Sequence, residues 1–197
     1  MTTAMDRDPD SPWNPTLPVE ASPEDYEREV VEWLRASGET IEEFSVRHLE
    51  HLEGTGGDYE FDAVARFSIL GGASITVVVE CKRYSRPVDR EKVLVLWAKL
   101  QDVRAHKATM FATCGFQTGA LDYARYKGIA TVVFTDGSFF YQTKALGPRP
   151  SPPPWLNLPR YTGAFVVKTG PKVSTSMVRV GHCEPISAWL RGVERDA

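Results

Sequence analysis

The spacing of hydrophobic and polar positions predicts three helices in the first two thirds of the chain. Apolar residues at intervals of three and four mark the segments 22–37 and 89–106. A third helix is expected over 118–127, where Gly128 closes it. Ser22 and Asp89 are expected to cap the first two helices, because their side-chain oxygens can accept hydrogen bonds from backbone N–H groups in the first turn.

Other segments carry the alternation or the short apolar runs that predict strands, namely 41–49, 61–70, 75–82, 108–113 and 129–134. Gly71 and Gly72 separate the second of these from the third and predict a hairpin. The resulting order, α-β-β-β-α-β-α-β, combines a hairpin with βαβ units. It predicts an α/β fold with a mixed central sheet flanked by helices.

Proline content divides the chain into four parts. Residues 1–21 are acidic, rich in proline and poor in large apolar residues, which predicts a flexible N-terminal tail. Residues 22–146 are expected to form the main domain. Residues 147–159 contain six prolines and are expected to be a linker. Residues 160–197 are then expected to form a small C-terminal appendage.

Composition excludes several classes of protein. The chain has no apolar run near the roughly 18 residues that a membrane helix needs, and no secretory signal is expected. Three cysteines are too few for a disulfide framework, which favours a reduced, cytoplasmic location. A net charge of −3 excludes a globally basic nucleic-acid binder.

The charges are nevertheless uneven along the chain. Residues 21–60 hold 3 basic and 12 acidic side chains, whereas residues 80–107 hold 8 basic and 4 acidic ones. A polyanion would approach the second segment and avoid the first. Solvated helix faces would explain the same distribution.

The most informative polar residues end the apolar strand 75–82. Because residues two apart share one face of a strand, Glu80 and Lys82 point the same way. A water-facing ion pair would explain them equally well, unless Asp62 joins them from the preceding strand. A two-residue loop would pair Asp62 with Cys81, on the face opposite Glu80. An odd-length loop or a bulge would bring Asp62 beside Glu80 or Lys82.

Two carboxylates and a lysine in one cluster have a chemical logic for phosphodiester hydrolysis. Carboxylate oxygens suit Mg²⁺, which also takes phosphate oxygens as ligands and lowers the pKa of a bound water. A lysine beside that water could orient or deprotonate it and neutralise developing charge. Glu27 lies on the inward face of the first helix, where an acid needs a partner, a metal or a path to solvent.

Further motifs stand in a fixed order along the chain: Tyr26-Glu27, Gly56-Gly57-Asp58 leading to Asp62, Glu80-Cys81-Lys82-Arg83-Tyr84, Thr113-Cys114-Gly115-Phe116 with Ala120 and Ala124, and Asp136-Gly137. In this order they resemble the catalytic domain of Mrr-type restriction endonucleases, within the PD-(D/E)xK nuclease superfamily. The resemblance covers a little over half the chain and implies a restriction-endonuclease-like fold.

The resemblance implies a role for each matching residue. Asp62 and Glu80 would bind the metal ion, with Mg²⁺ as the expected cofactor and Mn²⁺ as a substitute. Lys82 would be the catalytic lysine and Glu27 an accessory catalytic acid. Many Mrr-like proteins have glutamine at the position of Glu80. The acid brings this chain closer to type II restriction enzymes and archaeal Holliday-junction resolvases.

Four other residues are expected to contact nucleic acid. Arg83 and Arg86 follow the strand that carries the lysine and could hold phosphates, although ordinary surface charge would explain them too. Thr113 and Gln117 precede a helix whose first amides could bind a phosphate. His48 and His51 are three apart, but a strand followed by a loop is expected to separate them, so a metal site there is not predicted.

These observations favour a Mg²⁺-dependent endonuclease that hydrolyses DNA in a restriction or defence role. Two alternatives remain open from the sequence: a non-catalytic nucleic-acid-binding or assembly module, and an effector that is active only with a partner. The retained Asp62, Glu80 and Lys82 argue against the first alternative. A homodimer or partner complex is expected, because one active site cuts one strand and duplex cleavage usually needs two.

Overall fold

The computed structural model describes residues 21–38, 41–69, 71–136, 161–180 and 184–190, whose strands form one seven-stranded sheet in the order β1 to β7. The expected linker at 147–159, and all but Ala21 of the expected tail, lie outside these ranges. The first eight elements follow the predicted order: α1 (Pro23–Gly38), β1 (Ser45–Gly54), β2 (Gly57–Ile69), β3 (Ala73–Lys82), α2 (Arg90–Asp102), β4 (Lys107–Ala112), α3 (Thr118–Lys127) and β5 (Ala130–Asp136).

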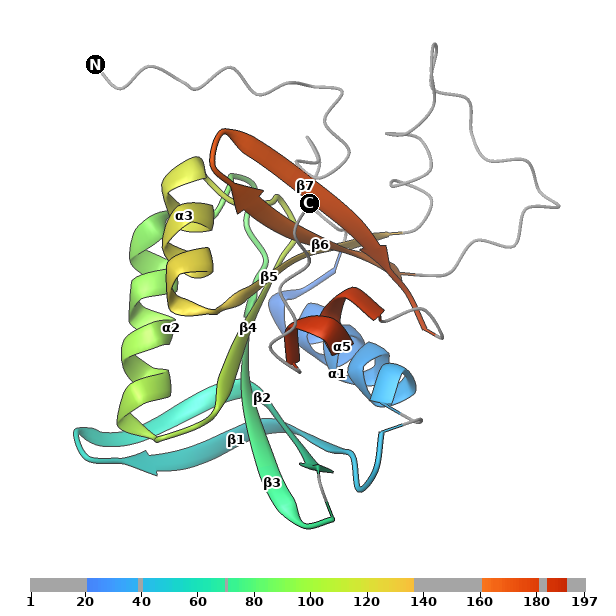
Figure 1. The fold of residues 1–197 in the computed structure, drawn as a ribbon, viewed down its shortest axis with the longest axis vertical. Helices are drawn as coiled ribbons and strands as arrows, with labels where there is room; N and C mark the ends of the chain where they lie inside the picture. The colour runs from blue at the N-terminus through green and yellow to red at the C-terminus, as the bar shows by residue number, and fades with distance from the viewer. Residues whose placement is uncertain (1–20, 39–40, 70, 137–160, 181–183, 191–197) are drawn as a thin grey trace, which may run out of the picture.

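The sheet is mixed, as the order of elements predicts. Strands β3, β4 and β5 are parallel, and every other neighbouring pair is antiparallel. Helices α2 and α3 lie on one side of the sheet and α1 and α5 on the other (Figure 1). Each side has its own buried apolar cluster, with Val64 and Val78 facing α2 and α3, and Ala63 and Val79 facing α1.

The expected helix caps are present. The Ser22 hydroxyl accepts a hydrogen bond from the backbone N of Asp25 at 3.0 Å, and an Asp89 oxygen accepts one from the backbone N of Lys92 at 3.1 Å. Gly128 closes α3 with φ at 68°, a left-handed conformation that glycine adopts without steric cost.

Several element boundaries differ from the sequence prediction, and two of these differences meet at one contact. The sequence predicts a loop at 54–58 and an end of the preceding strand at 49, but Gly54 pairs with Gly57 and only two residues turn the chain. Helix α2 ends at Asp102 and does not reach His106. The Asp102 carboxylate accepts hydrogen bonds from the Thr55 hydroxyl and from the Gly56 backbone N, which fixes the turn against the end of the helix.

The C-terminal segment continues the same sheet. Strand β6 (Tyr161–Thr169) pairs antiparallel with β5, and β7 (Lys172–Val178) pairs with β6. Helix α5 (Glu184–Leu190) packs near β7. Ala164, Val166 and Val178 from these strands are buried in the two apolar clusters. The described part of 160–197 is therefore integral to the domain and does not stand apart as an appendage.

None of the helices in the described ranges combines the length and the apolar character that a membrane crossing requires.

Candidate active site

The candidate site forms where β2 and β3 part. Their pairing runs from Ile69 with Ala73 to Ala63 with Val79 and then stops. Beyond that point β2 stays paired with β1, and β3 stays paired with β4. The backbone N of Cys81 donates a hydrogen bond of 2.6 Å to Asp62 Oδ2, so a side chain replaces the lost backbone partner.

The hairpin register satisfies the condition that the sequence imposed. Because Ile69 pairs with Ala73, the connecting loop has three residues, which is an odd length. Extrapolating this register beyond the last pair brings Asp62 level with Glu80, the arrangement that an odd-length loop predicts. Asp62 is close enough to Glu80 and Lys82 for the charge of each to shift its pKa.

The backbone is distorted at the level of Asp62. The pairing of β1 with β2 is continuous from Ser45–Arg66 to Gly54–Gly57, except that Leu49 and Asp62 do not pair. Leu49 is exposed and has a positive φ of 49°, a backbone conformation that residues with a Cβ atom adopt at an energetic cost. Phe61 and Val64 both enter the apolar cluster beside α2, although a regular strand would turn them to opposite faces.

Two lysines balance the negative charge of Glu80. Lys82 Nζ lies 2.9 Å from its Oε2 atom, and Lys99 Nζ of α2 lies 2.9 Å from its Oε1 atom. Burial alone would raise the pKa of Glu80, but the two ammonium groups outweigh burial and hold this pKa below its usual value. Burial would lower the pKa of Lys82, yet the charge of Glu80 raises it. Lys82 is accordingly a protonated donor at neutral pH in this arrangement.

The negative charge of Asp62 is less well balanced than that of Glu80. Burial, together with the nearby charge of Glu80, raises its pKa from 3.8 to about 6, although the hydrogen bond from Cys81 and the charge of Lys82 act in the opposite direction. Glu27 adds a further small increase. Glu80, Lys82 and Glu27, the other three predicted catalytic residues, are thus all close enough to Asp62 to influence its pKa.

Glu27 approaches from α1, on the other side of the sheet from Lys99. The preceding residue, Tyr26, is fully buried, and its hydroxyl donates a 3.3 Å hydrogen bond to the carbonyl of Phe134. This anchor fixes the first turn of α1. Glu27 Oε2 lies 3.3 Å from His48 Nε2 of β1, and only 17% of the Glu27 side chain is exposed.

The donor chemistry fits a hard divalent cation. Asp62 and Glu80 bring carboxylate oxygens from adjacent strands, and Mg²⁺ is commonly held by one or two carboxylates together with water and phosphate oxygens. Within the described ranges no three Asp, Glu, His or Cys side chains form a ready-made metal cage. A two-carboxylate site completed by solvent and substrate is the arrangement that these residues can provide.

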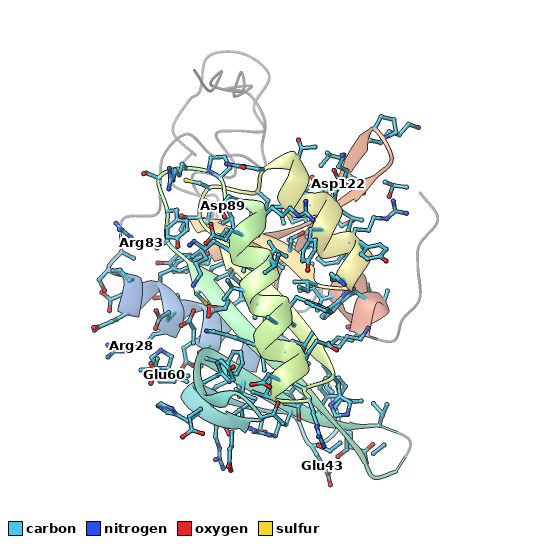
Figure 2. All side chains as sticks on the ribbon, turned by 90° about the vertical axis from the view of Figure 1, so that its left-hand side faces the viewer. Arg28, Glu43, Glu60, Arg83, Asp89 and Asp122 are labelled. Atoms are coloured by element: carbon cyan, nitrogen blue, oxygen red, sulfur yellow. The ribbon has the colours of Figure 1, made fainter. Side chains whose placement is uncertain are left out.

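The expected nucleic-acid contacts differ in accessibility. Arg86 and Gln117 are exposed, whereas Arg83 is half-buried and its Nε atom has no hydrogen-bond partner among the described residues. In Figure 2 the labelled Arg83 appears on the same side of α2 as Arg28 of α1. Thr113 is fully buried, and its hydroxyl bonds both the backbone N and the backbone O of Tyr84. The hydroxyl of Thr113 is thus already engaged within the fold.

Sequence reasoning missed two members of this cluster. Lys99 follows the buried Leu96 by three positions and precedes the buried Leu100, so a lysine beside the apolar stripe of α2 was the available signal. His48 and His51 contact different acids, Glu27 and Glu60 respectively. Nothing in the local sequence around His48 indicates its contact with α1.

A mixed sheet between helices, with acids and a lysine at the point where two antiparallel strands part, defines a restriction-endonuclease-like fold. The sequence model of the restriction endonuclease family, for the Mrr catalytic domain, matches residues 19–142. This match covers more than half of the chain, and the chain belongs to that family.

Comparison with solved structures finds the crystal structure of a protein of unknown function, AF1548, at 20% sequence identity and a TM-score of 0.44. The similarity covers 53% of this chain and 54% of that chain, about half of each. No curated protein sequence matches this chain.

Proposed function

We propose that this protein is a Mg²⁺-dependent endonuclease that hydrolyses phosphodiester bonds of DNA, in a restriction or defence role. The observation that carries the proposal is that Asp62 lies near the Glu80–Lys82 ion pair, at the point where β2 and β3 part. Membership of a restriction endonuclease family supports DNA as the substrate class. A divalent ion, Mg²⁺ or in its place Mn²⁺, would supply charge stabilisation at the phosphate and a water of lowered pKa.

The protein's own groups have separate roles in this proposal. Asp62 and Glu80 hold the ion through carboxylate oxygens. Lys82, whose raised pKa keeps it protonated, orients the attacking water and stabilises negative charge as it develops on the phosphate. Glu27 is an accessory acid that supports the far side of the site, with His48 holding its carboxylate in position.

DNA contacts belong to polar residues beside this cluster. Arg83 and Arg86 follow β3 directly and hold phosphates, which positions the backbone without reading sequence. Gln117 is exposed at the N-terminus of α3, and its side chain makes no capping hydrogen bond there, so the amide can contact DNA. A homodimer, or a complex with a partner, would bring two such sites to a duplex in a cytoplasmic setting.

The test is cleavage of plasmid and linear duplex DNA by the purified protein with Mg²⁺, Mn²⁺ or EDTA. We expect cleavage that requires the metal and disappears in Glu80→Gln. Lys82→Ala should retain the fold and reduce the rate by about 10²–10⁴-fold. Glu27→Gln should reduce it less than Asp62→Asn does.

The alternative is a partner-activated effector or a non-catalytic binding module. Metal-dependent DNA cleavage by the isolated protein would exclude both. If the folded protein cuts no DNA with either metal, the proposal of an autonomous nuclease is wrong. Normal cleavage by Lys82→Ala would instead remove only the role given to that lysine.

A further inference from the structure

The second lysine at Glu80 reaches the site from a different element. Lys99 lies near the end of α2, and its ammonium group contacts Glu80 Oε1 at 2.9 Å. Only 23% of the Lys99 side chain and 10% of the Glu80 side chain are exposed. Lys99 Nζ also lies over the Phe61 ring, 5.4 Å from its centroid, where a cation–π interaction favours the ammonium group. This pair is not a solvated surface contact.

The contacts of Glu80 leave neither of its oxygens without an ammonium partner. Lys82 takes Oε2 and Lys99 takes Oε1. A divalent cation that binds Glu80 must therefore share or displace at least one ammonium group, because like charges repel within a few ångströms. Lys82 is held beside Asp62 and Glu80 by its own strand. Lys99 enters from a separate helix through a long, flexible side chain, so it is the ammonium that can leave.

We propose that Lys99 couples metal binding to DNA binding at this site. In the DNA-free protein its ammonium group occupies Glu80 Oε1 and opposes the cation. When a DNA phosphate enters, Lys99 exchanges the carboxylate for phosphate oxygens, and Glu80 becomes free for the metal. The inference rests on the proposed function, since it requires Glu80 to be a metal ligand.

This arrangement has a thermodynamic consequence. If DNA makes Glu80 more available to the metal, the metal must strengthen DNA binding by the same factor, because coupling between two ligands is reciprocal. We expect a factor of roughly 10, within the common range of such couplings. Phosphate oxygens that bind the metal couple the two ligands as well, so the contribution of Lys99 is the part of the coupling that is lost when its charge is removed.

The first measurement is a titration of the DNA-free protein with Mn²⁺, in which electron paramagnetic resonance monitors metal binding. Lys99→Met removes the charge and keeps an unbranched side chain, and we expect it to bind Mn²⁺ roughly 10-fold more tightly than the parent. Lys99→Arg keeps the charge and should retain the parent affinity. Lys172→Met makes the same charge change at an exposed position of β7 and should have no effect.

The second measurement adds duplex DNA with phosphorothioate linkages, which resist cleavage, to the parent and to Lys99→Met. Because phosphate oxygens also bind the metal, duplex should tighten Mn²⁺ binding in both proteins, and by roughly 10-fold more in the parent. Circular dichroism of each variant establishes that it is folded. Should Lys99→Met fail to fold, Lys99→Gln provides the same loss of charge.

The outcomes separate the two ideas. Equal Mn²⁺ affinity of the parent and Lys99→Met, or equal tightening by duplex in both proteins, overturns the coupling while leaving nuclease activity intact. Tighter Mn²⁺ binding by Lys99→Met in a protein that cuts no DNA supports the competition at Glu80 and contradicts the nuclease. Mn²⁺ binding that is unchanged by Glu80→Gln removes the metal site and with it the coupling.

Discussion

At the residue scale, the two acids expected to bind metal differ in how the protein balances their charge. Glu80 has an ammonium group on each oxygen, and this lowers its pKa. Asp62 has a backbone N–H group and a more distant lysine, while burial and Glu80 raise its pKa to about 6. Ionisation of Asp62 therefore destabilises the folded protein when no cation is near. A bound metal ion would offset this destabilisation.

Asp62→Asn should stabilise the metal-free protein at pH 7. The folded pKa of about 6 lies above the reference value of 3.8, so ionisation destabilises the folded state as pH rises through 6. Asparagine keeps an oxygen for the Cys81 N–H group and carries no charge. The free energy of unfolding should rise by about 1–3 kcal/mol in EDTA.

The pH dependence checks the cause of this effect. Below about pH 3 Asp62 is mostly protonated in both the folded and the unfolded states, so the advantage of Asp62→Asn should vanish there. Urea denaturation at about pH 3 and pH 7 measures both values. A variant that is no more stable than the parent at pH 7 would contradict an unfavourable, ionised Asp62.

Thr113 and Gln117 should respond differently to substitution, although the sequence predicts a nucleic-acid contact for both. Thr113→Val leaves the backbone N–H and C=O groups of Tyr84 without their side-chain partner, and the free energy of unfolding should fall by about 1–3 kcal/mol. Gln117→Ala should change stability by less than about 0.5 kcal/mol and weaken DNA binding.

Chemical denaturation and fluorescence anisotropy with labelled duplex measure the two effects separately. Thr118→Val, an exposed threonine at the start of α3, is the matched control and should leave stability unchanged. If Thr113→Val weakens DNA binding without loss of stability, its hydroxyl contacts DNA after all.

At the element scale, local sequence patterns predict the order of helices and strands, but they do not predict where two paired strands separate. Apolar spacing and caps predicted the first eight elements and their sequence. The parting of β2 from β3 depends on Asp62 bonding the Cys81 backbone, a contact between residues 19 positions apart. The glycine content of 54–58 predicts a loop, and the contact with Asp102 that holds this segment in a tight turn joins residues 46 to 47 positions apart.

Asp102 is expected to hold the β1–β2 turn, and through it the strand that carries Asp62. Its carboxylate accepts hydrogen bonds from the turn and from the Tyr59 hydroxyl, and these bonds lower the pKa of Asp102. Asp102→Ala should increase hydrogen exchange at the Gly56 amide and lower the rate of cleavage. Because the folded pKa is depressed, the anchor should persist above pH 4 and weaken as pH falls further.

Hydrogen exchange followed by mass spectrometry over 54–60 gives the measurement. Asp58→Ala removes an exposed acid from the start of β2 and is the matched control. Unchanged exchange in Asp102→Ala would show that strand pairing alone holds the turn.

At the scale of the whole molecule, the sheet extends beyond the region that the family model matches. The match ends at residue 142, whereas β6 and β7 begin at Tyr161 and Lys172. A domain boundary at 146 followed from proline content, which identifies possible linkers but carries no information about strand pairing. The pairing of β5 with β6 is a contact between distant segments that no local pattern revealed.

A chain that ends at residue 146 should therefore lose cooperative folding. It would expose the edge of β5 and remove Ala164, Val166 and Val178, which are buried in the two apolar clusters. It would also lose the stacking of Tyr161 on Phe134, whose ring centroids lie 5.1 Å apart. Each fully buried valine contributes about 1.5–3 kcal/mol, so the combined loss approaches the 5–15 kcal/mol that stabilises a typical domain.

Thermal melting followed by circular dichroism measures this loss directly. We expect no cooperative transition for the shortened chain. In the 197-residue chain, Val178→Ala should lower the transition temperature, because loss of this buried side chain reduces the free energy of unfolding by about 1–3 kcal/mol. Val173→Ala on the same strand, at an exposed position, should melt like the parent. If the shortened chain melts cooperatively near the parent temperature, residues 22–146 fold alone. In that case β6 and β7 would be additions to a complete core, and the function of this protein could be studied on the shorter chain.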